Sequence, residues 1–91
     1  DVESALIGHE KVLEAGVIPH ADKTDNLKPK AFVVLNEGVE ASRELKDDLK
    51  AHVRNKIEVW KYPRWIEFVD DLPKTATGKI QRFKLREMDQ G

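Results

Sequence analysis

Between Leu45 and Ile57 an apolar residue recurs at every fourth position, and this spacing limits most strongly what the chain can fold into. Leu45, Leu49, Val53 and Ile57 fall on one face of an α-helix, and charged residues occupy the other faces. Ser42 is a suitable N-cap, so the spacing predicts a helix from Ser42 to about Ile57. A helix with one apolar stripe needs another apolar surface to pack against, which neighbouring elements must supply.

Two predicted strands flank this helix. The run KAFVVL at residues 30–35 is continuous and apolar, which is typical of a strand buried on both faces. The segment RWIEFVDDL at residues 64–72 alternates, with Ile66 and Phe68 on one face. A strand–helix–strand passage of this kind predicts that the second of these strands runs parallel to the first after a right-handed crossover.

The N-terminal third predicts a helix, a strand and a long loop. Residues 1–7 suit a short helix with Asp1 as its N-cap. Residues 12–18 are apolar and partly β-branched, which favours a strand that Gly16 weakens or bulges. The polar, proline-containing residues 19–29 are typical of a loop. We therefore expect the strand to form an antiparallel hairpin, with a long loop, with the run KAFVVL.

The C-terminal segment IQRFKLREM, residues 80–88, suits a short helix with Leu85 and Met88 three positions apart. The full order is helix, strand, strand, helix, strand, loop, helix. This order predicts an α+β fold, a three-stranded sheet with helices packed on it. At 91 residues the chain is at most one small domain, spanning 1–91.

Composition narrows the function classes. The chain has no cysteine, which excludes disulfides and thiolate chemistry, and its three histidines are too far apart in sequence to suggest a metal site. The 16 basic and 17 acidic residues give no overall attraction to nucleic acid, and the longest apolar runs are too short to span a membrane. Since the sequence begins at Asp1 without a signal segment, we expect a fragment of a longer, soluble and cytoplasmic protein.

Three groups of residues are weaker candidates for a site. Basic and aromatic side chains alternate in RNKIEVWKYPRW, residues 54–65, and such a mixture can bind a nucleotide or a single strand. Its members are Arg54, Lys56, Trp60, Lys61, Tyr62, Arg64 and Trp65. Packing in the core or between domains is the favoured interpretation, because the balanced charge lacks a nucleic-acid signature. Isolated acids (Asp1, Glu3, Glu10, Asp70, Asp71) and His20 more often cap turns or lie in solvent than bind metal or act as bases.

The segment LPKTATGKIQR, residues 72–82, contains a Gly-Lys pair in a polar loop. A phosphate-binding P-loop needs a glycine five places before the pair and Ser or Thr directly after it, but Pro73 and Ile80 stand there. The P-loop hypothesis therefore fails. By composition alone, the remaining possibilities are a solvated basic turn or a loop that presents a lysine at its tip.

The spacing of this segment resembles the C-terminal signature loop of the adenylate-forming superfamily, which includes acyl-CoA synthetases, adenylation domains and luciferases. The shared form is Pro-Lys-Thr, two variable residues, Gly-Lys, an apolar residue, a variable residue and Arg. The matching residues are Pro73, Lys74, Thr75, Gly78, Lys79, Ile80 and Arg82. The segments DVESAL, KAFVVL and KYPRWIEFVDDLPKT extend the resemblance over nearly the whole chain. Within the superfamily, KPKAFVVL together with KYPRWIEFVDDLPKTATGKIQRFKLRE is most similar to benzoate- and other aryl-CoA ligases.

The resemblance implies a role for each loop residue. Lys79 is the expected catalytic residue, which stabilises formation of an acyl-adenylate from ATP and a carboxylic acid. Thr75, Thr77 and Gly78 are expected to shape the loop close to ATP, and Arg82 to anchor it. The domain is then expected to rotate as a lid, so that the acyl group reaches coenzyme A.

The resemblance also places most of the enzyme outside this chain. A large N-terminal domain would bind ATP, magnesium and the carboxylic acid, which is expected to be aromatic, and the hinge would lie upstream of Asp1. We therefore expect the 91 residues alone to bind no cofactor and to be inactive. Two alternatives stay open: a module in which a protein lysine acetyltransferase modifies Lys79, and a small nucleotide-binding protein complete in itself.

Overall fold

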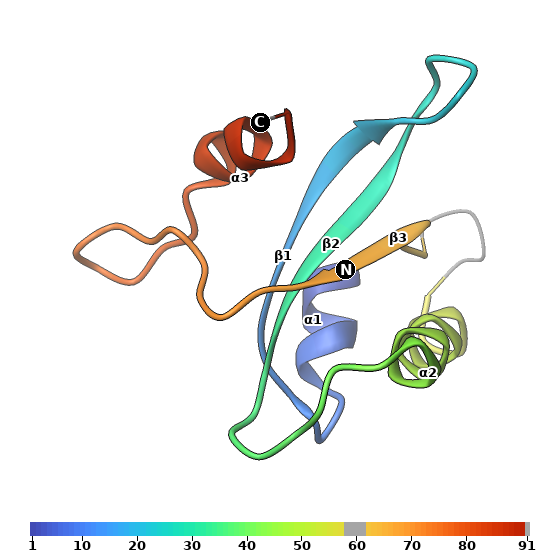
Figure 1. Ribbon diagram of the computed structural model, residues 1–91, viewed down its shortest axis with the longest axis vertical. Helices are drawn as coiled ribbons and strands as arrows, with labels where there is room; N and C mark the ends of the chain where they lie inside the picture. Colours follow the sequence, from blue (N-terminus) through green and yellow to red (C-terminus); the bar gives the residue numbers. More distant parts are fainter. Residues whose placement is uncertain (58–61, 91) are drawn as a thin grey trace.

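The fold is a three-stranded sheet with helices on both faces. The structure, a computed structural model, describes residues 1–57 and 62–90. Its elements are α1 (Val2–Ile7), β1 (Val12–Ala21), β2 (Leu27–Leu35), α2 (Arg43–Arg54), β3 (Trp65–Phe68) and α3 (Arg82–Gln90). The strands lie in the order β1-β2-β3, with β1 antiparallel and β3 parallel to β2 (Figure 1). The predicted α+β class and both predicted strand directions are confirmed.

The predicted helices form close to their expected positions. Asp1 caps α1 by accepting from the Ser4 N–H at 2.8 Å, and Ser42 caps α2 by accepting from the Leu45 N–H at 3.0 Å. The second helix ends at Arg54, three residues before the predicted boundary, and α3 lies two residues later than predicted. Predicted helix ends commonly differ from observed ones by this much because terminal turns fray.

The predicted loop over residues 19–29 is too long, because only residues 22–26 lie between β1 and β2. The hairpin continues through most of that segment, and Pro19 lies directly opposite Pro29 in the register. Proline has no backbone N–H to donate, and because the two prolines face each other, the ladder lacks these donors at one position only. The remaining turn is closed by Asp22, whose carboxylate accepts from the Thr24 N–H at 2.8 Å and the Asn26 N–H at 3.0 Å.

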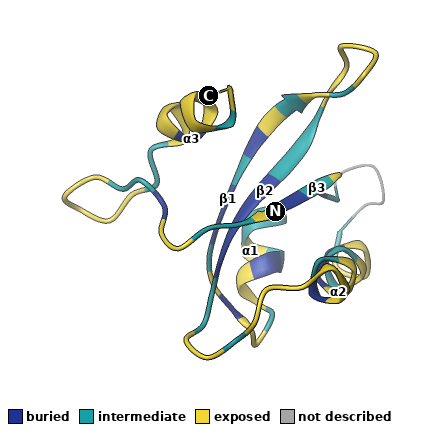
Figure 2. Ribbon diagram, in the orientation of Figure 1, coloured by how far each residue is buried: buried dark blue, intermediate teal, exposed yellow. Residues whose placement is uncertain are grey.

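Both faces of the sheet are covered, as the continuous apolar run predicts (Figure 2). Ala31 and Val33 of β2 point to one face, while Phe32 and Val34 point to the other. The core of the first face, called here the α1/α2 face, contains Leu6, Val12, Ala15, Ala31, Val33, Leu45, Leu49, Val53 and Ile66. The core of the second, called the α3 face, contains Ile18, Phe32, Val34, Leu72 and Leu85.

Gly16 has a different role from the predicted one. The bulge in β1 lies between Val12 and Glu14, and Gly16 pairs regularly with Phe32. A Cβ atom at Gly16 would lie only 2.8 Å from Leu85 Cδ1. The glycine therefore lets α3 pack close to the sheet through Leu85, which is fully buried, whereas Met88 is half exposed.

Candidate functional site

The loop that carries the Gly-Lys pair leaves the sheet after β3 and returns to α3 on the α3 face. Its two arms form a short stem in which Lys74 and Ile80 make an antiparallel bridge. The Gln81 N–H closes the stem by donating to the Pro73 carbonyl at 2.8 Å. Figure 1 shows the loop, in orange, projecting away from the rest of the molecule. The loop is therefore both ordered by its own hydrogen bonds and prominent on the surface.

Thr75 organises the tip of the loop. Its N–H donates to the Lys79 carbonyl at 2.8 Å, its hydroxyl accepts from the Lys79 N–H at 3.1 Å, and its carbonyl accepts from the Gly78 N–H at 2.9 Å. The Thr77 hydroxyl lies 3.0 Å from the Thr75 hydroxyl. Gly78 has a φ of 87°, in the left-handed region that favours glycine. These contacts hold the main chain of Lys79 in one conformation.

The main chain of Lys79 is held by hydrogen bonds, but its side chain extends into solvent. It is exposed, and among residues 1–57 and 62–90 no carboxylate lies within ion-pair distance of its ammonium group. A cation on a fixed main chain without a neutralising partner is available to an anion supplied from outside this part of the chain. The loop can therefore present one positive charge at a defined place.

Lys74, at the base of the same loop, has acidic partners. Its Nζ lies 2.8 Å from each carboxylate oxygen of Glu14 on β1 and 3.2 Å from Asp71. The hydrogen bonds to Glu14 and Asp71 raise the pKa of Lys74. The hydrogen bond from Lys74 lowers the pKa of Asp71, which also accepts from the Leu72 N–H. The charge of Lys74 is thus neutralised locally, in contrast to that of Lys79.

Arg82 ends the loop and begins α3. Its Nε donates to Glu3 Oε2 at 3.1 Å, and its Nη2 contacts the other Glu3 oxygen. The same Glu3 carboxylate accepts from the Val17 N–H of β1 at 2.8 Å. Glu3 therefore connects the end of the loop to both α1 and the sheet.

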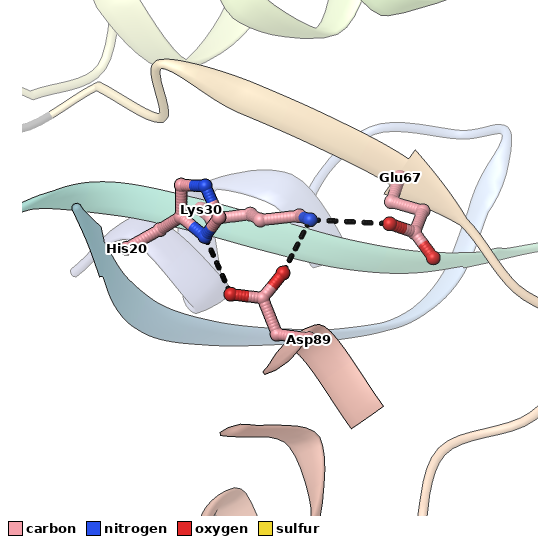
Figure 3. Close-up of polar contacts among 4 residues, drawn as sticks. All are labelled: His20, Lys30, Glu67 and Asp89. Atoms are coloured by element: carbon pink, nitrogen blue, oxygen red, sulfur yellow. Dashed lines mark hydrogen bonds and ion pairs between the residues drawn. The ribbon is translucent and has the colours of Figure 1, made fainter. Parts of the chain in front are cut away.

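The far end of α3 is held by a charged cluster shown in Figure 3. Asp89 accepts from Lys30 Nζ and pairs with His20 Nδ1, both at 2.5 Å, and Lys30 also pairs with Glu67 at 3.1 Å. Burial raises the pKa of Asp89, but the hydrogen bonds from Lys30 and His20 outweigh it and lower the pKa overall. Burial lowers the pKa of Lys30, but its bonds to Asp89 and Glu67 outweigh this and raise it.

The basic and aromatic residues of 54–65 do not gather into one surface among the described residues. Tyr62 lies under the Arg54 guanidinium, 5.1 Å from ring centroid to Cζ, and packs against the α1/α2 face. Trp65 makes an edge contact with His20, with ring centroids 4.6 Å apart. Trp60 and Lys61 lie outside the described residues.

The described ranges contain no group of three His, Asp or Glu side chains that could hold a metal ion. They also contain no helix long and apolar enough to cross a membrane.

The structure gives roles to several acids that the sequence left unassigned. Glu14 and Asp89 were not singled out at all, because each lies about 60 or more residues from its partner and carries no local signal.

Comparison with known proteins agrees with this description. The family model of the AMP-binding enzyme C-terminal domain matches residues 1–79. A benzoate–CoA ligase of Thauera aromatica is 66% identical over 86 residues, which are 94% of this chain and 16% of that enzyme. The chain therefore spans about a sixth of the length of this curated relative.

Solved structures show the same fold. A Brucella canis acyl-CoA synthetase matches 98% of this chain and 16% of its own, with a TM-score of 0.91 and 46% identity. The anthranilate–CoA ligase AuaEII, solved with anthranoyl-AMP, matches 96% of this chain and 17% of its own, with a TM-score of 0.90 and 50% identity. The arrangement of sheet, helices and loop, together with these matches, shows that the chain belongs to the family of AMP-binding enzyme C-terminal domains.

Proposed function

We propose that this chain is the C-terminal lid of an AMP-forming aryl-CoA ligase and that Lys79 is its adenylation lysine. The observation that carries the proposal is the charge of Lys79, which pairs with no carboxylate in residues 1–57 and 62–90 and stands on a main chain held by Thr75 and Gly78. Lys74, which lies in the same loop, supports the assignment by contrast, because its charge is already paired with Glu14.

The chemistry of acid activation needs such a cation. ATP supplies the α-phosphate that the carboxylate attacks, so two anions must approach and negative charge spreads over the phosphate oxygens. A held ammonium group can orient the carboxylate and stabilise the charge that develops in the transition state. Lys79 fits this task because it is a compact cation whose side chain can reach outward from the loop.

The remaining parts of the reaction are assigned to the rest of the enzyme. We propose a large N-terminal domain that binds ATP, magnesium and an aromatic acid, and a rotation of the present domain before the acyl group passes to coenzyme A. The names of the benzoate–CoA and anthranilate–CoA ligases, and the anthranoyl-AMP bound in the latter, support an aromatic acid. Cytoplasmic location and inactivity of the 91 residues alone stay predictions.

The test is carboxylate-dependent exchange between ATP and pyrophosphate in the full-length enzyme. Lys79→Ala is expected to lower the exchange rate by about 10² to 10³, as is usual for one preorganised charge-stabilising group. Thioester formation from preformed benzoyl-adenylate and coenzyme A should change much less. Lys23→Ala, at an exposed position in the hairpin turn, is the matched control. Near wild-type exchange by Lys79→Ala would show the assignment to be wrong.

The exposure of Lys79 also supports a second role, as an acceptor for a protein lysine acetyltransferase. Acetylation would remove the charge and block adenylation as the alanine substitution does. Mass spectrometry after incubation with an acetyltransferase and acetyl-CoA should find the modification at Lys79 in preference to the paired Lys74. Modification at Lys74 with none at Lys79 would contradict this role.

A further inference from the structure

We propose that Glu14 is a positioning residue for Lys79, which acts by holding Lys74 at the base of the loop. The inference rests on the proposed function, because it assigns to Glu14 the placement of the adenylation lysine. It concerns a residue on β1, outside the loop and 60 positions from Lys74 in the sequence.

The contact between Glu14 and Lys74 is well suited to fix a position. Nζ of Lys74 lies 2.8 Å from both oxygens of Glu14, and both side chains are only 28% exposed. Asp71 gives a second, weaker contact at 3.2 Å from a side chain that is 75% exposed. Glu14 is therefore the principal partner of Lys74.

The backbone of β1 directs Glu14 towards the loop. The register of β1 against β2 shifts between Val12 and Glu14, so that Glu14 is the first residue paired after the bulge. Bulges commonly change the direction in which a neighbouring side chain points. An irregularity of the strand thus coincides with the residue that reaches the loop.

A short path of bonds connects Lys74 to Lys79. Lys74 is bridged to Ile80, the neighbour of Lys79, across the stem. Lys74 also precedes Thr75, which bonds both the N–H and the carbonyl of Lys79. Displacement of Lys74 from Glu14 would move both arms of the stem and with them the tip that carries Lys79.

A positioning role and a merely structural role predict different results. Partly exposed ion pairs contribute little to stability, so loss of this one should hardly change the resistance of the protein to urea. A displacement of a catalytic group by about 1 Å, in contrast, can lower a rate by about 10². Activity should therefore respond to Glu14 much more strongly than stability does.

The experiment compares Glu14→Gln with Glu37→Gln in the full-length enzyme, since Glu37 is an exposed glutamate in the turn after β2. We expect Glu14→Gln to lower kcat of ATP–pyrophosphate exchange by about 10- to 100-fold with little change in KM. Glu37→Gln should match wild type, and Glu14→Asp should recover part of the rate because it keeps the charge. Urea unfolding and thioester formation from preformed benzoyl-adenylate should be unchanged in all three variants.

The double variant separates the positioning role from the proposed function. In a Lys79→Ala background, Glu14→Gln should cause no further loss, because Glu14 acts through Lys79. A further loss there, or an equal loss of thioester formation, would overturn the positioning role. Wild-type exchange by Glu14→Gln in an enzyme that Lys79→Ala impairs would overturn it too, while the proposed function stands. Wild-type exchange by Lys79→Ala would instead remove the proposed function.

Discussion

The two faces of the sheet are held in different ways. On the α1/α2 face, Leu6, Leu49 and Val53 are fully buried and pack against the strands, so apolar burial holds both helices. On the α3 face, the helix contributes one fully buried residue, Leu85, and charged contacts hold its two ends. The loop that carries Lys79 belongs to this second face.

The difference shows how a small domain can present a projecting loop. Apolar burial is strong but has no preferred direction, whereas ion pairs and hydrogen bonds define which atoms meet. The loop has few buried side chains, and Figure 2 shows its tip exposed. The ion pairs of Glu14 with Lys74 and of Glu3 with Arg82 orient the two ends of the loop, which apolar burial does not do there.

The largest expected effect is the loss of packing on the α1/α2 face. Leu49→Ala should lower the free energy of unfolding of the 91-residue chain by about 2–5 kcal/mol in urea titrations. Leu85→Ala should lower it less, because Leu85 is the one fully buried residue of α3 and the helix can settle onto Gly16 when the leucine is shortened. Equal losses at the two positions would contradict the proposed difference between the faces.

A smaller effect is expected from the charged cluster at Asp89. Asp89→Asn should lower the free energy of unfolding by about 1–3 kcal/mol, because Asp89 is only 7% exposed and Lys30 and His20 lose a charged partner. Glu67→Gln is the matched control, since Glu67 is 53% exposed and should matter less. A greater loss for Glu67→Gln would contradict the assignment of Asp89 as the centre of the cluster.

The same cluster predicts a pH dependence with a definite sign. The pKa of Asp89 is lower in the folded than in the unfolded chain. Its contribution to the free energy of unfolding is therefore present above the unfolded pKa of about 3.9 and is lost as the pH falls through the folded pKa. The pKa of Lys30 is raised in the folded chain, so its contribution to the free energy of unfolding is lost only at alkaline pH, above the unfolded pKa of about 10.4. In urea titrations from pH 6 to pH 3, the difference in the free energy of unfolding between wild type and Asp89→Asn should become smaller.

The smallest of these effects is expected at Gly16. Gly16→Ala should destabilise the chain by about 1 kcal/mol, at the lower end for added core volume, because the atom that the new methyl group meets is the end of a leucine side chain. Amide hydrogen exchange should become faster in α3 and stay unchanged in α2. Faster amide exchange in α2 alone would contradict the prediction that Gly16 affects the packing of α3.

The elements that could be predicted from the sequence are those with a local signal. The four-residue spacing from Leu45 and the cap at Ser42 identify α2, and the run before them identifies β2. The hairpin was underestimated, because Pro19 and Pro29 each indicate a loop and only their pairing across the ladder makes them compatible with strands. Gly16 was expected to weaken the strand or to mark a bulge, because the sequence does not reveal which helix will pack above it.

By itself, the sequence determined the types of the elements, their order and the spacing that identifies the loop with Lys79. These properties depend on residues a few positions apart, whose periodicity and hydrogen bonding are visible along the chain. Only the tertiary structure decided that Glu14 meets Lys74, that Glu3 meets Arg82 and that Asp89 meets Lys30. These partners are 60, 79 and 59 residues apart, and charged side chains are so frequent in the sequence that only the packing of helices on the sheet selects which of them meet.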